Sequence, residues 1–420
     1  MKALLGLALR SAWNRRLTLG MTLAAVALSS LLLLGVERLR ADLRASFSMS
    51  VSGVDLVVGA RGSPVQLMLY SVFRMGEVTQ NMSWASAQWL AQQPGVAWTV
   101  PVSLGDSHRG FPVLGTTPAY FDHFRYGDRR ELQFSAGERF DGLFEAVLGA
   151  EVAERLGYRP GEKITLAHGS GEGPAAEHSD KPFVVTGILA RTGTPVDRTV
   201  HISLESMEAL HIDWAGGAPI PGLSIPAPLV RKFDLTPKAV TAVFVGLENR
   251  AAVFGLQRAI NGRQGEALMA VLPGVALDEL WQLVAVAERY AQLVSMLVVA
   301  VGLTGLIAVI LAGLNERRRE LAILRSVGAR PLDIFALLAL EGGTLALAGS
   351  ALGAAAVWVL VLLLAPWLQA NYGLTLARGL PSAAEWQLLA GIIAVGAIAS
   401  LLPGWRAYRL SLADGMTPRL

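Results

Sequence analysis

The stretch NERRRELAILRSVGAR, from Asn315 to Arg330, decides how the rest of the chain is arranged. It follows one long apolar run and shortly precedes another, yet it contains five arginines. An arginine near the bilayer centre costs about 2.5–3.5 kcal/mol on insertion scales, so the stretch has to lie at or outside the membrane surface. Its apolar residues recur at helical spacing, and Gly328 followed by Pro331 predicts a helix end and a turn. We therefore expect a short basic helix between two membrane spans.

The composition indicates a protein that is partly embedded in a membrane. Of the 420 residues, 53% are hydrophobic and only 16% are charged, whereas soluble proteins carry about a quarter charged residues. The formal net charge of +3 argues against a nucleic-acid-binding protein with a broad basic face. The absence of cysteine excludes disulfides and thiolate metal sites, and it suits an oxidising or a reducing compartment equally well.

Four apolar stretches are long enough to cross a bilayer, for which a helix needs about 20 residues. The first exceeds the ~7–15 apolar residues of a signal peptide, so we expect a retained anchor. The predicted fold class is a membrane protein with four transmembrane helices and a large α+β extracytoplasmic domain between the first and second. In chain order, the expected segments are 1–16, span 17–36, outer domain with stalk helices 37–289, span 290–314, basic segment 315–331, span 332–367, loop 368–385, span 386–403 and tail 404–420.

The basic residues of the short segments set the expected orientation. Four lysines or arginines precede the first span, five lie in the quoted stretch, and three follow the last span. The loop 368–385 has Arg378 alone. Because short basic segments stay in the cytoplasm, both termini and the quoted stretch should be cytoplasmic and the large domain should face outward.

The longer stretch NERRRELAILRSVGARPLDIFALLALEGG resembles the cytoplasmic loop and following span of the MacB/FtsX-type ABC transporter permeases. That family shares the basic start, a helix similar to RELAILRSVGA, the triplet DIF and an acidic residue early in the next span. The resemblance implies a coupling helix that docks on the ATP-binding subunit, with Leu321, Leu324 and Val327 filling a groove there. The docking residues that it implies are Glu316, Arg317, Arg318, Arg319, Glu320, Leu321, Ile323, Leu324, Arg325, Val327 and Gly328.

Three further segments extend the resemblance over most of the chain. EAVLGAEVAERLGYRPGEKITL and FVVTGILARTGTPVDRTVHISL look like the core of the family's periplasmic domain, and LPGWRAYRLSLADGM looks like its cytoplasmic tail. No Gly-Lys-Ser/Thr triplet of a phosphate-binding loop occurs, and only about 16 residues precede the first span. The layout is therefore similar to that of FtsX or the LolC/LolE permeases, with no fused ATPase domain of the MacB kind.

Glu341 lies about two turns into the third span, where a carboxylate is costly unless it faces protein or water. It is either a helix-packing and topology residue or an intramembrane linkage that reaches Arg325 or Arg330 of the coupling helix. Small residues in pairs four apart would allow close helix contact within or between subunits. These helix-packing residues are Gly342, Ala346, Gly349 and Gly353.

The outer domain shows a mixed pattern of strands and helices. Glu145–Leu166 predicts strand, helix, turn and strand, and strands are also expected at 183–189 and 239–247. Val54–Gly76 begins as a strand, breaks at Gly59–Pro64 and continues as an apolar helix pattern. We expect this segment to pack in the domain core; the alternative is an apolar surface for a lipidic or lipoprotein ligand.

All six histidines fall in the outer domain, and no HExxH motif occurs. Ligand sets of His168, His178 and Asp180, or of His201, His211 and Asp213, are conceivable. Hydrogen-bonded or solvated histidines are far commoner, so we assign no metal site, and no grouping of residues supports a catalytic role. The six are His108, His123, His168, His178, His201 and His211.

The resemblance implies a permease subunit that couples ATP hydrolysis by a separate ATPase subunit to movement of its periplasmic domain, for export or extraction of a lipoprotein, lipid or hydrophobic substrate. Such a subunit is not an enzyme and binds no cofactor, since ATP and Mg bind the partner ATPase. The implied partners are this ATPase, a second permease copy, the membrane and a periplasmic protein or lipoprotein, with no nucleic acid. The implied location is the bacterial inner membrane.

Two other functions stay open. One is FtsX-like signalling to a periplasmic partner without transport. The other is a metal-linked envelope system, which only the distribution of the histidines suggests. A membrane scaffold without an ATPase would leave the coupling helix unexplained.

Overall fold

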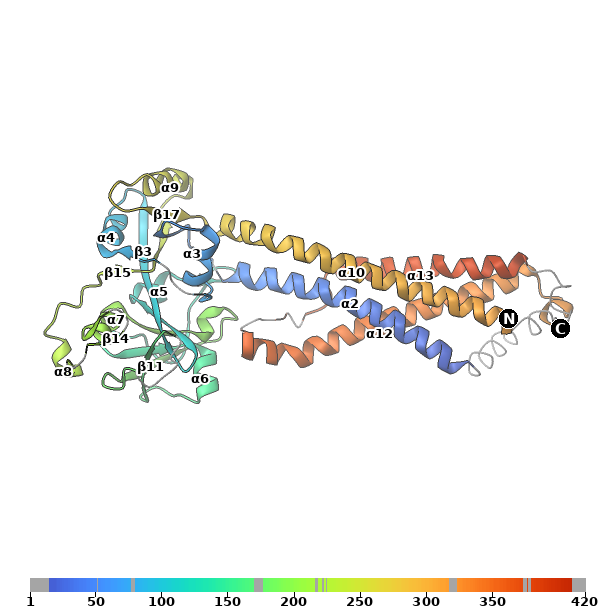
Figure 1. The fold of residues 1–420 in the computed structure, drawn as a ribbon, viewed down its shortest axis with the longest axis horizontal. Helices are drawn as coiled ribbons and strands as arrows, with labels where there is room; N and C mark the ends of the chain where they lie inside the picture. The colour runs from blue at the N-terminus through green and yellow to red at the C-terminus, as the bar shows by residue number, and fades with distance from the viewer. Residues whose placement is uncertain are drawn as a thin grey trace. The chain divides into compact units, whose positions relative to one another are not determined.

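The apolar stretches form long helices in the computed structural model of the chain (Figure 1). The helices are α2 (Arg16–Met49), α10 (Pro273–Glu316), α12 (Pro331–Tyr372) and α13 (Ala383–Arg409). Among the residues that the structure describes, these four helices are long and apolar enough to cross a membrane. An α/β region lies between the first and second of them in the chain, as the sequence predicts. The structure describes residues 15–50, 52–76, 80–169, 177–215, 218–220, 223, 225–316, 323–372, 376 and 379–409.

The chain divides into two units. The helical unit comprises Met1–Asp42, Ala285–Trp367 and Leu376–Leu420. The α/β unit comprises Leu43–Val284 and Leu368–Thr375.

In the helical unit, α2 and α12 meet through small residues, which let helices approach closely. A methyl group added to Gly349 would lie 2.8 Å from the Val26 Cβ, and one added to Gly353 would lie 2.7 Å from the Ser30 Cβ. The hydroxyl groups of Ser30 and Ser350 lie 3.4 Å apart at the same contact. Gly349 and Gly353 of the predicted small-residue pattern thus pack against another helix of the same chain.

The other half of the pattern lies between α12 and α13. A methyl group on Gly342 would lie 2.3 Å from the Ser400 Cβ, and one on Gly396 would lie 2.6 Å from the Ala346 Cβ. The Ser400 hydroxyl also donates a hydrogen bond to the Ala339 carbonyl at 3.1 Å. Helix α12 therefore has glycines at its contacts with two other helices.

Helices α10 and α12 pack through larger apolar side chains instead. Most large apolar residues on the outside of the bundle stay exposed, as expected for surfaces that face lipid. The buried cluster between the two helices consists of Leu303, Leu306, Ile310, Leu314, Ile334, Leu338 and Ala346.

The α/β unit is built on one mixed sheet. Neighbouring strands are antiparallel except for the parallel pairs β12–β4 and β11–β8. Strand β10 (Ala167–His168) adds to β3, and β9 (Lys163–Ile164) adds to β11. The main order is β17 (Leu268–Val271), β1 (Leu56–Ala60), β16 (Ala242–Leu247), β3 (Val96–His108), β4 (Phe111–Thr116), β12 (Val200–Ser203), β8 (Glu145–Leu148), β11 (Phe183–Leu189) and β7 (Phe134–Gly137).

Short helices and strand pairs complete this unit (Figure 1). The helices are α3 (Pro64–Ser71), α4 (Trp84–Ala91), α5 (Ala119–His123), α6 (Ala150–Leu156), α7 (Leu204–His211), α8 (Ala227–Val230) and α9 (Val253–Asn261), with 3-10 turns at Pro195–Arg198 and Arg250–Ala252. The strand pairs are β2 (Met82–Ser83) with β15 (Ala239–Val240), β5 (Arg125–Tyr126) with β6 (Arg130–Glu131), and β13 (Trp214–Ala215) with β14 (Ala218–Pro219).

Two predicted segments have the expected structure. Glu145–Leu166 forms β8, α6 and β9, and α6 ends at Gly157, whose φ of 74° is a left-handed conformation that glycine adopts without strain. Val54–Gly76 forms β1 and then α3, and most of its apolar side chains, including those of Leu67 and Met68, are buried in the core of the unit, whereas Met75 is exposed. The core interpretation of this segment is therefore confirmed.

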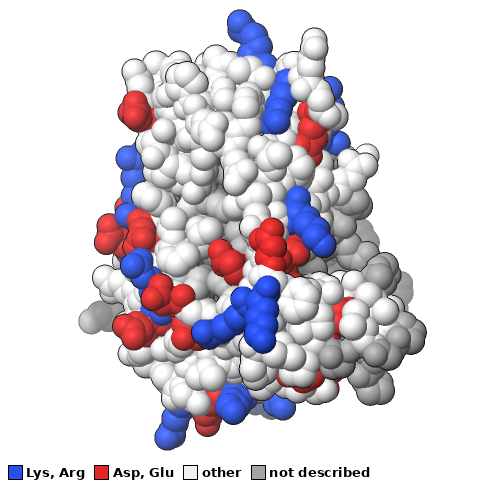
Figure 2. Space-filling model, turned by 90° about the vertical axis from the view of Figure 1, so that its left-hand side faces the viewer, with Lys and Arg blue, Asp and Glu red and all other residues white. Residues whose placement is uncertain are grey.

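The charged residues visible in Figure 2 are of both signs. Lysine and arginine side chains alternate with aspartate and glutamate side chains over this face, and no broad area of one sign is visible. Nucleic-acid binding requires a continuous basic surface, which this face does not present.

Candidate functional site

The segment between α10 and α12, called the coupling segment below, contains the stretch that the sequence predicts to be a coupling helix. Helix α10 ends at Glu316 and α12 begins at Pro331, while residues 323–326 are helical and Gly328 makes the following turn with a φ of 105°. The left-handed φ at Gly328 is the helix terminator that the sequence predicts. The side chain of Glu316 and all of Arg317, Arg318, Arg319, Glu320 and Leu321 lie outside the described residues.

The apolar residues of this segment divide into two groups. Leu324 packs against the buried cluster of α10 and α12, so it is already used inside the helical unit. The side chains of Ile323 and Val327 are 61% and 81% exposed. Leu324 is partly buried against the bundle, and its expected role in filling a partner's groove stays a prediction. Among the described residues of the segment, Ile323 and Val327 present exposed apolar side chains.

Glu341 has a partner that the sequence does not suggest. Its carboxylate lies 3.0 Å from the Arg15 guanidinium, and both side chains are largely buried. The same guanidinium covers Gly313 near the end of α10, where an added methyl group would clash with it. Arg15 thus links the starts of α2 and α12 to the end of α10, next to the coupling segment. The contact of Glu341 with Arg325 or Arg330, which are nearer in sequence, stays a prediction.

A second buried charge group lies near the C-terminal end of the span in α2. Arg38 is 3.1 Å from Glu385 and 3.3 Å from Asp42, and it donates a hydrogen bond to the Gly379 carbonyl at 3.2 Å. Glu385 also forms a reciprocal capping box with Ser382 at the start of α13. These bonds attach α13 and the preceding loop to α2. Sequence reasoning missed them because Arg38 and Glu385 lie 347 residues apart.

An apolar pocket lies beside this charge group. Aliphatic and indole side chains form most of its wall, and Arg38 and Glu385 form its polar edge. The apolar residues that line it are Leu34, Ala354, Val357, Trp358, Val361, Pro381, Trp386 and Leu389.

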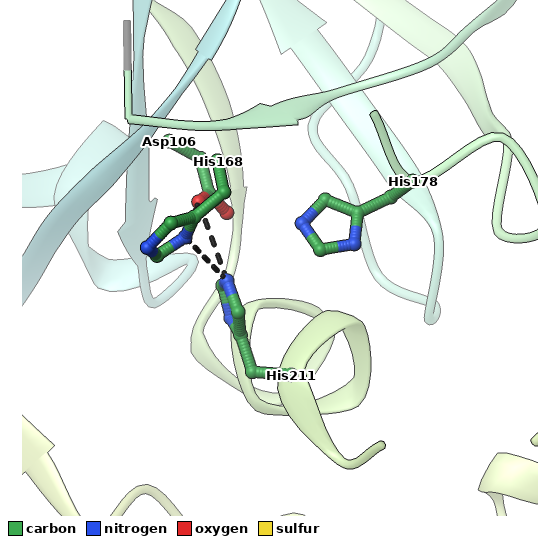
Figure 3. A group of neighbouring side chains, drawn as sticks. All are labelled: Asp106, His168, His178 and His211. Atoms are coloured by element: carbon green, nitrogen blue, oxygen red, sulfur yellow. Dashed lines mark hydrogen bonds and ion pairs between the residues drawn. The ribbon is translucent and has the colours of Figure 1, made fainter. Parts of the chain in front are cut away.

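In the α/β unit, four side chains converge from separate elements: Asp106, His168, His178 and His211 (Figure 3). Asp106 in β3 and His168 in β10 are directly opposite each other in the antiparallel register. Their side chains therefore share one face of the sheet, and the His168 Nδ1 lies 3.1 Å from the Asp106 Oδ1.

The third residue, His211, ends α7 and is oriented by its own helix. Its Nδ1 lies 2.9 Å from the Met207 carbonyl, which can only accept, so Nδ1 carries the proton. Nε2 then faces the other residues, 3.1 Å from the His168 Nδ1 and 3.3 Å from the Asp106 Oδ1. Burial alone would lower the pKa of His211, but the hydrogen bond to Asp106 and the charge of Asp106 raise it. Burial would raise the pKa of Asp106, but hydrogen bonds from His168 and His211 lower it to about 2.

The fourth residue, His178, is only 1% exposed. Its ring packs on Trp214 with a centroid separation of 4.4 Å and lies edge-on to His211 at 5.1 Å. Neither of its ring nitrogens has a hydrogen-bond partner among the described residues. Burial lowers the pKa of His178 to about 4, so the ring is neutral at pH 7.

The cluster differs from both ligand sets that the sequence suggested. It joins His168 and His178 from one set to His211 from the other, and it adds Asp106. Asp180 and Asp213 instead form ion pairs with the buried Lys181, at 3.0 and 2.8 Å. His201 lies against Tyr120 and Phe121, at centroid separations of 5.4 and 5.9 Å. Asp106 joins the cluster because it is paired with His168 in adjacent strands. This register is visible in the sheet and not in the local sequence, so the sequence offered no signal for Asp106.

Two family models match this chain. The model of the MacB-like periplasmic core domain matches residues 17–261, and that of the FtsX-like permease C-terminal region matches residues 293–412. The first alone covers more than half of the chain. Comparison with curated proteins gives no match.

Solved structures were also compared. The crystal structure of the periplasmic region of MacB from Actinobacillus actinomycetemcomitans matches at 12% identity and a TM-score of 0.34, covering 54% of this chain and 93% of that one. The extracellular domain of the noncanonic ABC-type transporter YknZ from Gram-positive bacteria matches at 13% identity and a TM-score of 0.29, covering 52% and 98%.

The family models identify the class of protein. The chain belongs to the MacB/FtsX family of ABC transporter permeases. It is a multi-pass inner-membrane protein with a MacB-like periplasmic core domain between its first and second apolar helices.

Proposed function

We propose that the chain is the permease subunit of an ABC transporter and works with a separate ATPase subunit and a second copy of itself. Family membership supports this proposal, and the observation that carries it is the coupling segment. There, Ile323 and Val327 present uncovered apolar side chains beside a run of arginines in the sequence. Exposed apolar side chains within a charged rim are typical of a protein-docking surface.

The proposed orientation places the coupling segment and both termini in the cytoplasm, because these short segments are rich in lysine and arginine and such segments stay on the cytoplasmic side. ATP-driven closure of the ATPase subunits would push the segment. The Arg15–Glu341 pair lies beside it and ties three helices together, so a push would move these helices as one body. Helices α2 and α10 continue beyond their apolar stretches and would carry this movement to the periplasmic domain.

The proposed work is export or extraction of a lipoprotein, lipid or other hydrophobic substrate. Family membership motivates this class of substrate. The pocket beside Arg38 and Glu385 does not, because it has a volume of only about 60 Å³ and is too small to hold an acyl chain. ATP and Mg would bind the partner, and this chain would supply no catalytic residue.

The docking surface is tested by Val327→Asp in the full chain, co-expressed with its ATPase. A carboxylate placed in an apolar groove loses its hydration without a partner, so we expect the affinity for the ATPase to fall about tenfold or more. Binding is measured by titrating the purified ATPase against the permease in detergent, and coupling is measured as permease-stimulated ATP hydrolysis.

The matched control is Leu380→Asp, which makes the same kind of change at a side chain that is 90% exposed in the loop before α13. This variant should bind the ATPase as the unmodified chain does. Leu324→Asp is a poorer test, because Leu324 also packs inside the helical unit. Equal ATPase affinity of Val327→Asp and the unmodified chain would remove the coupling segment as the docking site.

A further inference from the structure

We propose that Asp106, His168, His178 and His211 form a zinc-binding site in the α/β unit (Figure 3). This proposal revises the sequence-based assignment of no metal site. It concerns the α/β unit alone and holds whether or not the coupling segment docks an ATPase.

The spacing of the ligand atoms is the first argument. In tetrahedral zinc sites the metal–nitrogen distance is about 2.0–2.1 Å, which separates neighbouring ligand atoms by about 3.3 Å. The His168 Nδ1, His211 Nε2 and Asp106 Oδ1 are separated by 3.1, 3.1 and 3.3 Å, so they already match three corners of such a site. One ligand atom from each of the four residues lies within 4.8 Å of the others.

Unsatisfied buried atoms are the second argument. Both ring nitrogens of His178 and the Oδ2 atom of Asp106 are buried without a hydrogen-bond partner among the described residues. Buried polar atoms are normally paired, because an unpaired one loses its hydration without compensation. A metal ion bound by His178 would satisfy one of these nitrogens, and it would also balance the charge of the buried carboxylate.

The surrounding residues hold the ligands in place, as they do in established metal sites. The bond from the His211 Nδ1 to the Met207 carbonyl directs Nε2 toward the centre of the cluster. Lys181 is fully buried and bridges Asp180 and Asp213, which ties the segment after His178 to the segment after α7. Trp214 packs on the His168, His178 and His211 rings.

The donor set and its tetrahedral spacing together favour zinc over calcium and magnesium. Three imidazole nitrogens and one carboxylate oxygen suit zinc, whereas calcium and magnesium require mostly oxygen ligands. Four protein ligands fill a tetrahedral site, so the site binds zinc without leaving a position for a reacting water. The His168 and His211 side chains are 35% and 26% exposed, so an ion can reach the site from their side.

The first experiment measures zinc binding by the full chain in mild detergent after metal is removed with a chelator. Titration against a chromophoric zinc chelator should show one ion bound per chain. His178→Gln and His211→Gln should each weaken the zinc affinity by more than about 100-fold, since the loss of a direct ligand costs more than the 10–100-fold loss of a supporting residue. His123→Gln is the control, because His123 stacks on Trp98 outside the cluster.

Two further measurements separate the loss of the site from the loss of the fold. The metal-free variants should keep the thermal midpoint of the metal-free unmodified chain to within a few degrees, and zinc should raise the midpoint only where the site is intact. Cobalt(II) in place of zinc should give the intense visible absorption of a four-coordinate tetrahedral site. Absence of zinc binding, equal affinity in the ligand variants, or an octahedral cobalt spectrum would each overturn the proposal.

Discussion

His201 illustrates the effect of burial on one residue of the α/β unit. Its side chain is fully buried on β12, its Nδ1 donates to the Val147 carbonyl at 3.3 Å, and its Nε2 has no partner among the described residues. Burial, together with the nearby Arg74 guanidinium, lowers the pKa of His201 to about 3. The unfolded chain thus takes up a proton, between about pH 6.5 and about pH 3, that the folded chain does not.

The resulting prediction concerns acid stability. The free energy of unfolding should fall as the pH falls through this window, and His201 should contribute a slope of about 1.4 kcal/mol per pH unit. His201→Leu keeps an apolar side chain against the aromatic rings and cannot titrate, so it should flatten the pH dependence by that amount. Denaturant titrations of the full chain in detergent at several pH values measure the slope.

A control for this prediction is His123→Leu, which removes a half-buried histidine from the same unit. It should leave the steep acid dependence in place. If His201→Leu shows the same slope as the unmodified chain, the buried imidazole does not cause the acid sensitivity.

Single residues also show where sequence reasoning ends. The spacing along the chain brought His168 and His178 into one hypothetical site, but it paired them with Asp180 and left His211 in another. The hydrogen bonds to His168 span 62 residues from Asp106 and 43 from His211. Strand register determines such contacts, and no local pattern in the sequence encodes it.

At the scale of elements, α12 depends on its glycines. Gly342 touches Ser400 of α13, whereas no described atom lies within 4 Å of the position of a methyl group on the neighbouring Gly343. The two adjacent glycines thus face different surroundings on the same helix.

Gly342→Ala should therefore destabilise the helical unit and Gly343→Ala should not. Adding a methylene-sized group to a packed contact costs about 1–3 kcal/mol, whereas alanine in place of an exposed helical glycine gains up to about 1 kcal/mol. The thermal midpoint of the full chain in detergent should fall for the first variant and stay or rise for the second. A stable Gly342→Ala would show that α12 and α13 can separate at this contact without cost.

The sequence predicts individual helices and strands better than it predicts which of them pack together. Strand β11 has the alternating burial of its apolar residues, and α6 ends at the glycine where helical spacing stops. The coupling segment shows the limit of this reasoning. Helical spacing placed Leu324 on the same face as Val327, but packing against α10 and α12 uses Leu324 internally. A helical pattern identifies an apolar face but does not show which element or partner packs against it.

For the whole molecule, the absence of cysteine makes the proposed orientation directly testable. Ser326→Cys places a thiol at an exposed position of the coupling segment, and Leu380→Cys places one in the loop before α13. In intact cells, a membrane-impermeant maleimide should label Leu380→Cys and should label Ser326→Cys only after the membrane is opened. The reverse pattern would invert the orientation and remove the coupling segment from the cytoplasm.

The residues of the histidine cluster come from positions 106 to 211 of the chain, and this spread has a consequence for biogenesis. During synthesis and translocation the site cannot exist until α7 has emerged beyond the membrane and packed beside β3. A metal ion acquired there has to come from the supply outside the cytoplasm. Occupancy would then mark those molecules whose outer domain has finished folding, and a cell starved of that metal would accumulate inserted chains whose site is folded but empty.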